Sequence, residues 1–197
     1  MARIYYGWWV VAAFSVVTFT STGIRHAVGP FLKPIVADLG IDRATFSIVI
    51  AISLFLWGVF MPIAGKALDR FGTRPVAVTG TLLVALSLVL TSMVQNLWQF
   101  AVFRALLGLG MGGEWASGAA LVSETWPTKH RGRALGFMQS SWAIGFAVAA
   151  MVVGFVLPRW GWRAVFFVGI LPAFFTLWVR RNVEEPQIWH DARRARA

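Results

Sequence analysis

Three ionisable residues lie inside long apolar stretches of the sequence, where a charge is costly. They are Arg25, Arg104 and Glu114, and Glu114 follows Arg104 by ten residues within one stretch. A charged side chain near the centre of a bilayer costs about 2.5–3.5 kcal/mol on insertion scales, so such residues usually mark a binding site or a proton pathway. Arginine offers paired donors to a carboxylate, and a buried glutamate with a raised pKa can carry a proton.

We therefore expect Arg25 and Arg104 to bind the carboxylate of a substrate, and Glu114 to carry a coupling proton. Simpler alternatives stay open, because both arginines could extend their side chains to an interface and Glu114 could be a buried structural acid. At ten residues apart on a helix, Arg104 and Glu114 stand about 15 Å apart along the axis and on different faces. They are not expected to pair with each other.

Charged residues and glycines recur at fixed spacing in two short polar segments, Gly65 to Arg74 and Ser123 to Arg133. Gly65 permits close approach of another helix, and Gly72 permits a tight turn at positive φ. Positive charge that sets membrane topology would explain the arginines, but not the acid and both glycines. We expect a mixed-charge cluster at the cytoplasmic face, formed by Asp69, Arg70 and Arg74.

The elements that must position these residues belong to a largely apolar chain. Of the 197 residues, 58% are hydrophobic and 13% are charged, and the mean hydropathy is +0.68. A water-soluble fold of this size could not bury so much apolar surface. Six segments approach the ~20 residues that cross the hydrocarbon core. We expect one all-α, polytopic bundle over residues 1–197, with transmembrane helices near 6–36, 44–64, 76–94, 98–122, 134–157 and 164–179 and a tail at 180–197.

The distribution of Lys and Arg predicts the orientation of this bundle in a cell membrane, inner or plasma. With the N-terminus in the cytoplasm, the inner segments carry 12 basic residues and the outer segments carry 4. Cytoplasmic loops are enriched in Lys and Arg, so both termini are expected on the cytoplasmic side of a multi-pass protein. A secretory signal is the alternative for the first segment. Its long apolar run, without a clear cleavage site, favours a retained helix.

Several functional classes are disfavoured. The net charge of +10 would suggest nucleic acid in a soluble protein, but here the basic residues fall between apolar runs. Cysteine is absent, and the three His residues are scattered, so no disulfide, metal site or Ser-His-Asp arrangement is expected. The predicted partners are a lipid bilayer and a small molecule. We expect neither an enzyme nor a bound cofactor.

Three motifs resemble the major facilitator superfamily. The segment Gly65 to Arg74 resembles its G-x-x-x-D-R-x-G-x-R motif, and Arg104 to Gly110 its R-x-x-x-G-x-G pattern. The segment Ser123 to Arg133 resembles the S-E-x-x-P-x-x-x-R-G-R sequence of sugar porters and metabolite/proton symporters.

The first helix resembles that of monocarboxylate transporters, with Arg25 where that family carries a functional Lys. Arginine cannot release its proton in proteins, so Arg25 could bind a carboxylate but not relay a proton.

The resemblance covers nearly the whole chain and implies the N-terminal six-helix half of a 12-helix fold. It also implies a cytoplasmic gating motif with an ionic latch between Glu124, Arg131 and the segment carrying Asp69 and Arg70, with Asp69 contacting the opposite half as well. The residues of this gating motif are Gly65, Asp69, Arg70, Gly72, Arg74, Glu124, Arg131 and Arg133. Transporters of this type bind substrate near the midplane between two halves. A truncated product, a half that dimerises and a fragment completed by another chain are all compatible with the length.

The predicted function is secondary active transport of a small organic anion such as a monocarboxylate, by alternating access, with protons as the candidate coupling ion. A non-transporting membrane fragment or assembly partner is the alternative. The spare positive charge of two arginines against one glutamate favours an anion over a sugar or a cation.

Overall fold

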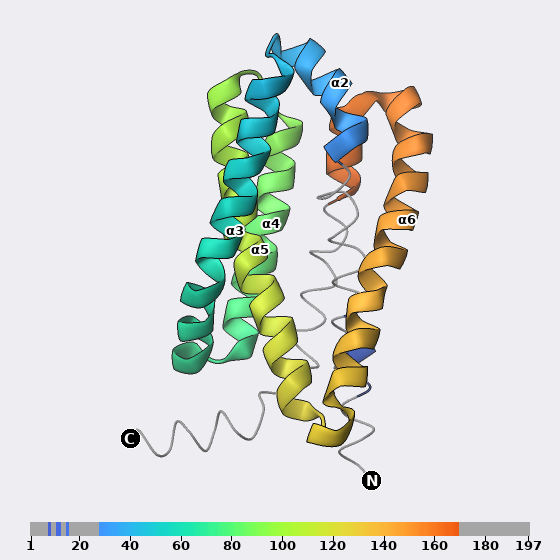
Figure 1. The fold of residues 1–197 in the computed structure, drawn as a ribbon. Helices are drawn as coiled ribbons and strands as arrows, with labels where there is room; N and C mark the ends of the chain where they lie inside the picture. The colour runs from blue at the N-terminus through green and yellow to red at the C-terminus, as the bar shows by residue number, and fades with distance from the viewer. Residues whose placement is uncertain (1–7, 9–10, 13–14, 16–27, 170–197) are drawn as a thin grey trace.

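The computed structural model describes residues 8, 11–12, 15 and 28–169. Within them the chain is helical and contains no β-strand, which confirms the predicted all-α fold class. Long helices alternate in direction between an upper and a lower end of the bundle, as oriented in Figure 1. The helices are α2 (Val28–Leu39), α3 (Arg43–Phe71), α4 (Thr73–Ser92), α5 (Leu97–Thr125) and α6 (Thr128–Val168).

Local sequence signals account for several helix ends. At the upper end, the side chain of Asp42 accepts a hydrogen bond from the backbone N–H of Thr45 at 2.6 Å and caps α3. Asn96 caps α5 in the same way through Gln99, at 2.9 Å. Such caps satisfy backbone donors that the first helical turn leaves unpaired.

At the lower end, the turn between α3 and α4 consists of one glycine. Gly72 has φ 93° and ψ 169°, a conformation open essentially to glycine alone. Its N–H donates to the carbonyl of Leu68 and closes α3. The tight turn predicted at this glycine is therefore confirmed.

The helices extend beyond the apolar segments from which they were predicted. α3 continues to Phe71, so Asp69 and Arg70 lie in its last turns and not in a loop. α5 includes Glu124, and α6 begins at Thr128. The hydropathy pattern reports the part of a helix within the hydrocarbon core, whereas Lys, Arg and Glu continue a helix readily outside it.

Three described helices, α3, α4 and α6, are long and apolar enough to cross a membrane. α5 has the length, with 29 residues, but carries Arg104, Glu114 and five glycines. The first predicted helix lies mostly outside the described residues, as does the sixth beyond Gly169. The number of crossings therefore stays a prediction.

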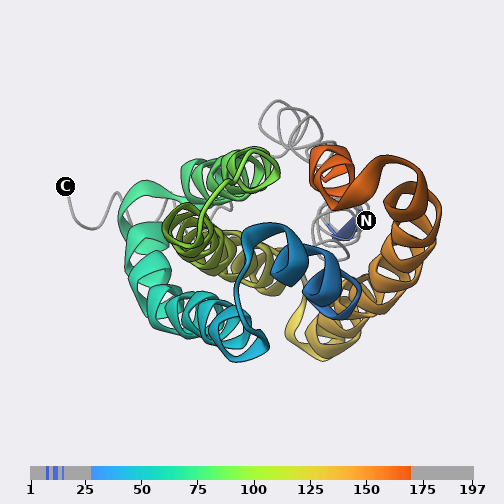
Figure 2. The ribbon, with the colours of Figure 1, turned by 90° about the horizontal axis from the view of Figure 1, so that it is seen from above.

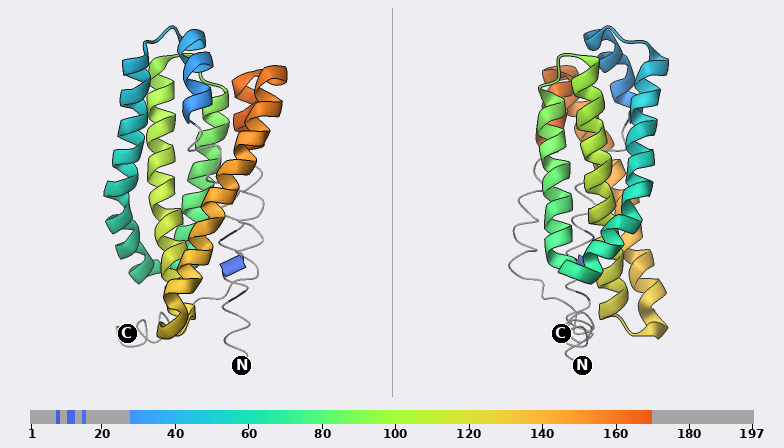
Figure 3. Two further views of the ribbon diagram at one scale, coloured as in Figure 1. Left: turned by 45° about the vertical axis from the view of Figure 1, so that its right-hand side comes forward. Right: turned by 90° about the vertical axis from the view of Figure 1, so that its left-hand side faces the viewer.

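α6 contains a break that separates the fifth predicted helix from the sixth. Gly161 has φ 75° and ψ 175°, which is not helical. The chain reverses there, so residues after Gly161 return along the bundle from its upper end (Figures 1 and 3).

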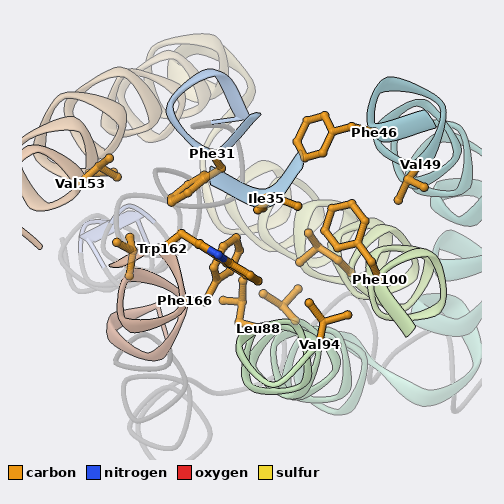
Figure 4. Close-up of a cluster of buried hydrophobic side chains, with 14 of the residues drawn as sticks. Phe31, Ile35, Phe46, Val49, Leu88, Val94, Phe100, Val153, Trp162 and Phe166 are labelled. Atoms are coloured by element: carbon orange, nitrogen blue, oxygen red, sulfur yellow. The ribbon is translucent and has the colours of Figure 1, made fainter. Parts of the chain in front are cut away.

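Seen from above, α3, α4 and α5 form one side of the bundle, and α6 forms the other, with α2 between them at the upper end (Figure 2). Two hydrophobic clusters lie inside. The upper cluster joins all five helices, and it includes Phe31, Phe46, Phe100, Trp162 and Phe166 (Figure 4). The lower cluster includes Leu121, Val122 and Met138.

Glycines bring α5 into backbone contact with α3. A Cβ atom added at Gly108 would overlap the carbonyl oxygen of Ser53, and one at Gly112 would stand 3.0 Å from the Cβ of Phe60. Residues four apart share a helix face, so these two glycines present one flat face to α3.

A second pair of glycines brings α5 equally close to α4. A Cβ at Gly110 would lie 2.8 Å from the carbonyl oxygen of Gly80, and one at Gly80 would lie 2.7 Å from the backbone nitrogen of Glu114. Residues two apart point in nearly opposite directions. The alternating glycines thus serve two neighbouring helices, and we call them the glycine seam: Gly80, Gly108, Gly110, Gly112 and Gly113.

Candidate functional site

Arg104 is buried in the upper half of α5, with 3% of its surface exposed. Its guanidinium carbon lies 5.4 Å from the ring centroid of Phe100 and 5.2 Å from that of Phe166. Both distances are within the range of a cation–π interaction. Among the described residues, no carboxylate pairs with this guanidinium, and its buried Nε has no hydrogen-bond partner.

Two different helices supply the rings beside Arg104. Phe100 lies one turn earlier on α5, and Phe166 follows the break at Gly161 in α6. Around Phe166 stand Phe31 of α2, at 4.9 Å between ring centroids, and Trp162, edge-on at 5.8 Å. Figure 4 shows these three side chains converging. The guanidinium therefore sits where α5 meets the returning part of α6.

The backbone at Arg104 is also anchored to α3. The hydroxyl of Ser53, which is buried, donates a hydrogen bond to the carbonyl oxygen of Arg104 at 2.6 Å. The first contact of the glycine seam, at Gly108, follows one turn later on the same face. These contacts hold the helix in place, so the direction of the arginine side chain depends mainly on the rings.

Glu114 is buried as well, with 6% of its surface exposed, next to the α4 side of the glycine seam. No ion pair joins it to Arg104 in the described part of the chain, in agreement with their ten-residue spacing. Neither residue lies on an exposed face. Arg25 lies outside the described residues, so its expected partnership with Arg104 stays a prediction.

A second charged group at the upper end escaped the sequence analysis. Arg163, just after the break in α6, forms an ion pair with Asp38 of α2 at 2.6 Å. It also donates to the carbonyl oxygen of Val94, between α4 and α5, at 2.8 Å. Arg163 thereby ties three parts of the bundle together, and nothing in the local sequence around it indicates these distant partners.

The first gating segment spans the lower ends of α3 and α4. Asp69 and Arg70 are exposed, and Arg70 lies over the ring of Phe71 at 5.3 Å. Arg74 is half-buried in the first turn of α4. No described residue comes within 4 Å of a Cβ built at Gly65, so the close approach expected there is not made by this part of the chain.

The second gating segment lies at the same end, where α5 meets α6. Glu124 is exposed in the last turn of α5, Arg131 is half-buried, and Arg133 is exposed near the start of α6. Trp8 and Trp126 meet edge-on there, 5.1 Å apart. The two segments thus share the lower end, whereas the ionic latch between them stays a prediction.

Phe100 and Phe166 were also missed by sequence reasoning. An apolar aromatic residue within an apolar segment carries no local signal of a functional position. Only the four-residue spacing between Phe100 and Arg104, which places both on one helix face, could have indicated the first of them. No such signal exists for Phe166, because it approaches from another helix.

Comparison with known proteins agrees with this architecture. The profile of the Major Facilitator Superfamily matches residues 14–196. A probable 4-methylmuconolactone transporter of Cupriavidus pinatubonensis is 34% identical over 98% of this chain and 44% of its own. The niacin transporter NiaP of Acinetobacter baylyi is 31% identical over 90% of this chain and 40% of its own.

Among solved structures, the proton:xylose symporter XylE from E. coli superposes with a TM-score of 0.85 at 16% sequence identity. The match covers 97% of this chain and 47% of XylE. The chain therefore spans less than half the length of the relatives it matches. By its sequence profile, its relatives and its fold, the chain belongs to the Major Facilitator Superfamily.

Proposed function

We propose that this chain forms one half of a secondary active transporter that moves a small organic anion across the membrane by alternating access. The observation that carries the proposal is Arg104, a buried cation beside two aromatic rings without an acid partner in the described residues. A carboxylate would complete its hydrogen bonds and balance its charge. The names of two relatives, transporters of niacin and of 4-methylmuconolactone, support a small organic metabolite.

In this proposal Arg25 joins Arg104 in holding the carboxylate, as the first-helix resemblance implies. Glu114 is the residue that carries a coupling proton. Glu114 is buried, and its backbone lies against Gly80 of α4. A movement of α4 relative to α5 would therefore change the surroundings of its carboxyl group. The two arginines stay charged throughout the cycle, because guanidinium does not release its proton in proteins.

The lower end carries the gating motif, and we assign it to the cytoplasmic side. The described basic residues there are Lys66, Arg70, Arg74, Lys129, Arg131 and Arg133, whereas the upper end carries Lys33, Arg43, Arg159 and Arg163. This asymmetry favours the lower end as cytoplasmic. The distribution of Lys and Arg over the whole sequence predicts both termini on the cytoplasmic side as well. Asp69, Arg70, Glu124 and Arg131 would then form and break contacts as the transporter changes state.

A second six-helix half, or a second copy of this chain, completes the proposed transporter. Two helices offer glycines around which the described chain leaves open space, namely Gly58 and Gly65 on α3 and Gly132, Gly136 and Gly154 on α6. Glycine surfaces let membrane helices pack closely. α3 and α6 lie on opposite flanks of the bundle (Figure 2), so a partner contacting both would enclose α2 and α5.

Binding and uptake by the purified chain test the proposal. Radiolabelled nicotinate, muconate and acetate are offered to the protein in nanodiscs, and uptake is measured in proteoliposomes while the oligomeric state is determined. Carboxylates should bind, and Arg104→Gln should abolish their binding. The matched control is Arg159→Gln, because Arg159 also lies over a ring, that of Phe155 at 4.0 Å, but is exposed. Carboxylate binding that survives Arg104→Gln refutes the site. If the unmodified chain itself binds no carboxylate, the alternative of a non-transporting assembly partner is favoured.

A further inference from the structure

The positive charge of Arg104 is stabilised by aromatic faces within the described chain, and not by an acid. Both flanking rings are completely buried, so water does not solvate the guanidinium from their side. A buried arginine that is paired with a carboxylate has its donors occupied by that partner. Rings stabilise the charge while leaving the N–H donors available.

The geometry of guanidinium separates these two kinds of contact. Its five N–H donors all lie in the plane of the group, whereas an aromatic ring attracts it through the ring face. Phe100 and Phe166 each bring a ring within 5.4 Å of the guanidinium carbon. A carboxylate that reaches the donor edge in this plane can form two parallel hydrogen bonds with the guanidinium.

We infer that Phe100 and Phe166 are positioning residues for anion binding: they stabilise the charged guanidinium of Arg104 and orient it, with its donor edge reserved for a carboxylate. The inference rests on the function proposed above. It goes beyond it by assigning the orientation of the anion site to two residues that carry no charge.

Each ring has a distinct support. Phe100 lies on the same helix as Arg104 and stacks on Phe46 of α3, at 5.7 Å between ring centroids. Phe166 depends on the reversal at Gly161 and on its contacts with Phe31 and Trp162. One ring therefore moves with the arginine, and the other connects the arginine to α6.

The chain offers matched controls for a role in packing alone. Phe31 and Phe46 are as deeply buried as the two flanking residues, and each touches one of their rings. No cation–π contact joins either of them to Arg104 in the described structure. Replacing any of the four by leucine removes a buried ring, but only two of these changes act directly on the guanidinium.

The test measures carboxylate binding by the full chain in nanodiscs. The probes are nicotinate and acetate, each compared with its neutral amide, nicotinamide or acetamide. Phe100→Leu and Phe166→Leu should each weaken carboxylate binding about tenfold, whereas Phe31→Leu and Phe46→Leu should leave it within about threefold. Replacing Phe166 by 3,4,5-trifluorophenylalanine keeps the shape of the ring but withdraws charge from its face, so affinity should fall while thermal stability stays the same.

The outcomes separate this inference from the function on which it rests. If Arg104→Gln abolishes binding while the four leucine variants behave alike, or while fluorination has no effect, the rings only pack and the inference is wrong. If Arg104→Gln binds carboxylates like the unmodified protein, or no carboxylate is preferred over its amide, the proposed site itself fails.

Discussion

α5 is held in two different ways along its length. At the glycine seam, its backbone touches the backbones of α3 and α4, with almost no side chain between them. Around Arg104, one to two turns nearer the upper end, the contact of α5 with α6 is made by large side chains, and the ring of Phe166 in turn packs on Phe31 of α2. Backbone contacts cannot adjust to an added atom, whereas aromatic side chains can shift between packed arrangements.

This difference indicates that one side of the bundle is rigid and that the other is attached to it more adjustably. α3, α4 and α5 form a unit in which relative movement would break close backbone packing. The returning part of α6 is attached to that unit through the contact of Phe166 with Arg104 and through the hydrogen bond from Arg163 to the carbonyl of Val94. One half-exposed ion pair joins it to α2. A binding site at the boundary between the two can respond to its ligand more readily than one inside the seam.

The largest effect is expected from a single methyl group in the seam. Gly108→Ala places its Cβ on the carbonyl oxygen of Ser53, so α3 and α5 must separate. We expect a loss of about 3 kcal/mol in the free energy of unfolding in detergent. Gly154→Ala is the control, because nothing in the described chain lies within 4 Å of its Cβ and alanine favours a helix. If the two variants were equally stable, the backbone contacts of the glycine seam would not be more sensitive to an added atom than the rest of the bundle.

The opposite sign is expected at the aromatic end. Arg104→Met retains the length of the side chain but removes a buried charge that has no acid partner in the described chain. The free energy of unfolding should rise by about 2 kcal/mol, while carboxylate binding is lost. Chemical denaturation in detergent measures the first quantity, and equilibrium binding measures the second. A strongly destabilised variant would mean that the arginine is primarily a structural residue.

A smaller loss is expected from the break in α6. Gly161→Ala forces an alanine into a conformation with φ near 75°, at a cost of about 1.5 kcal/mol. Because this glycine directs Phe166 toward Arg104, affinity for carboxylates should fall together with stability. Gly136→Ala, on the same helix with open space around it, provides the comparison. A change in stability without a change in affinity would show that the break at Gly161 does not contribute to carboxylate binding.

The ion pair at the upper end should contribute less. The side chains of Asp38 and Arg163 are 38% and 41% exposed, so water and salt screen their attraction. Asp38→Asn is expected to cost about 0.5 kcal/mol at low ionic strength and less at high salt. A double-mutant cycle with Arg163→Gln measures the coupling. A coupling of several kcal/mol would show that α6 is held to α2 as firmly as the helices of the glycine seam are held to one another.

The smallest effect concerns the start of α3. The side-chain hydroxyl of Thr45, and then its backbone N–H, lower the pKa of Asp42 below its usual 3.8. A carboxyl whose pKa is lowered by folding stabilises the protein above its unfolded pKa, and this contribution disappears as the pH falls through the folded value. Asp42→Asn also caps a helix but does not titrate. Plots of melting temperature against pH for the two proteins should therefore run parallel above about pH 5 and differ in slope below about pH 4.

Much of the architecture was accessible from the sequence alone. Hydropathy identified helical segments because a bilayer demands continuous apolar runs, and α3, α4 and α6 are long and apolar enough to cross a membrane. Gly72 was predicted as a turn because its spacing and backbone freedom are local properties. The charged residues Arg104 and Glu114 stood out because a charge within an apolar run is conspicuous in one dimension.

Only the tertiary structure decided what surrounds those charges. Phe166 reaches Arg104 because Gly161 reverses the chain, and Asp38 meets Arg163 across the bundle; neither contact is encoded by spacing along one helix. The alternating glycines of α5 are visible in the sequence, but their assignment to α3 on one face and α4 on the other required the helices to be in place. Sequence periodicity reports which residues share a helix face, whereas the partner of that face is set by the packing of all the helices together.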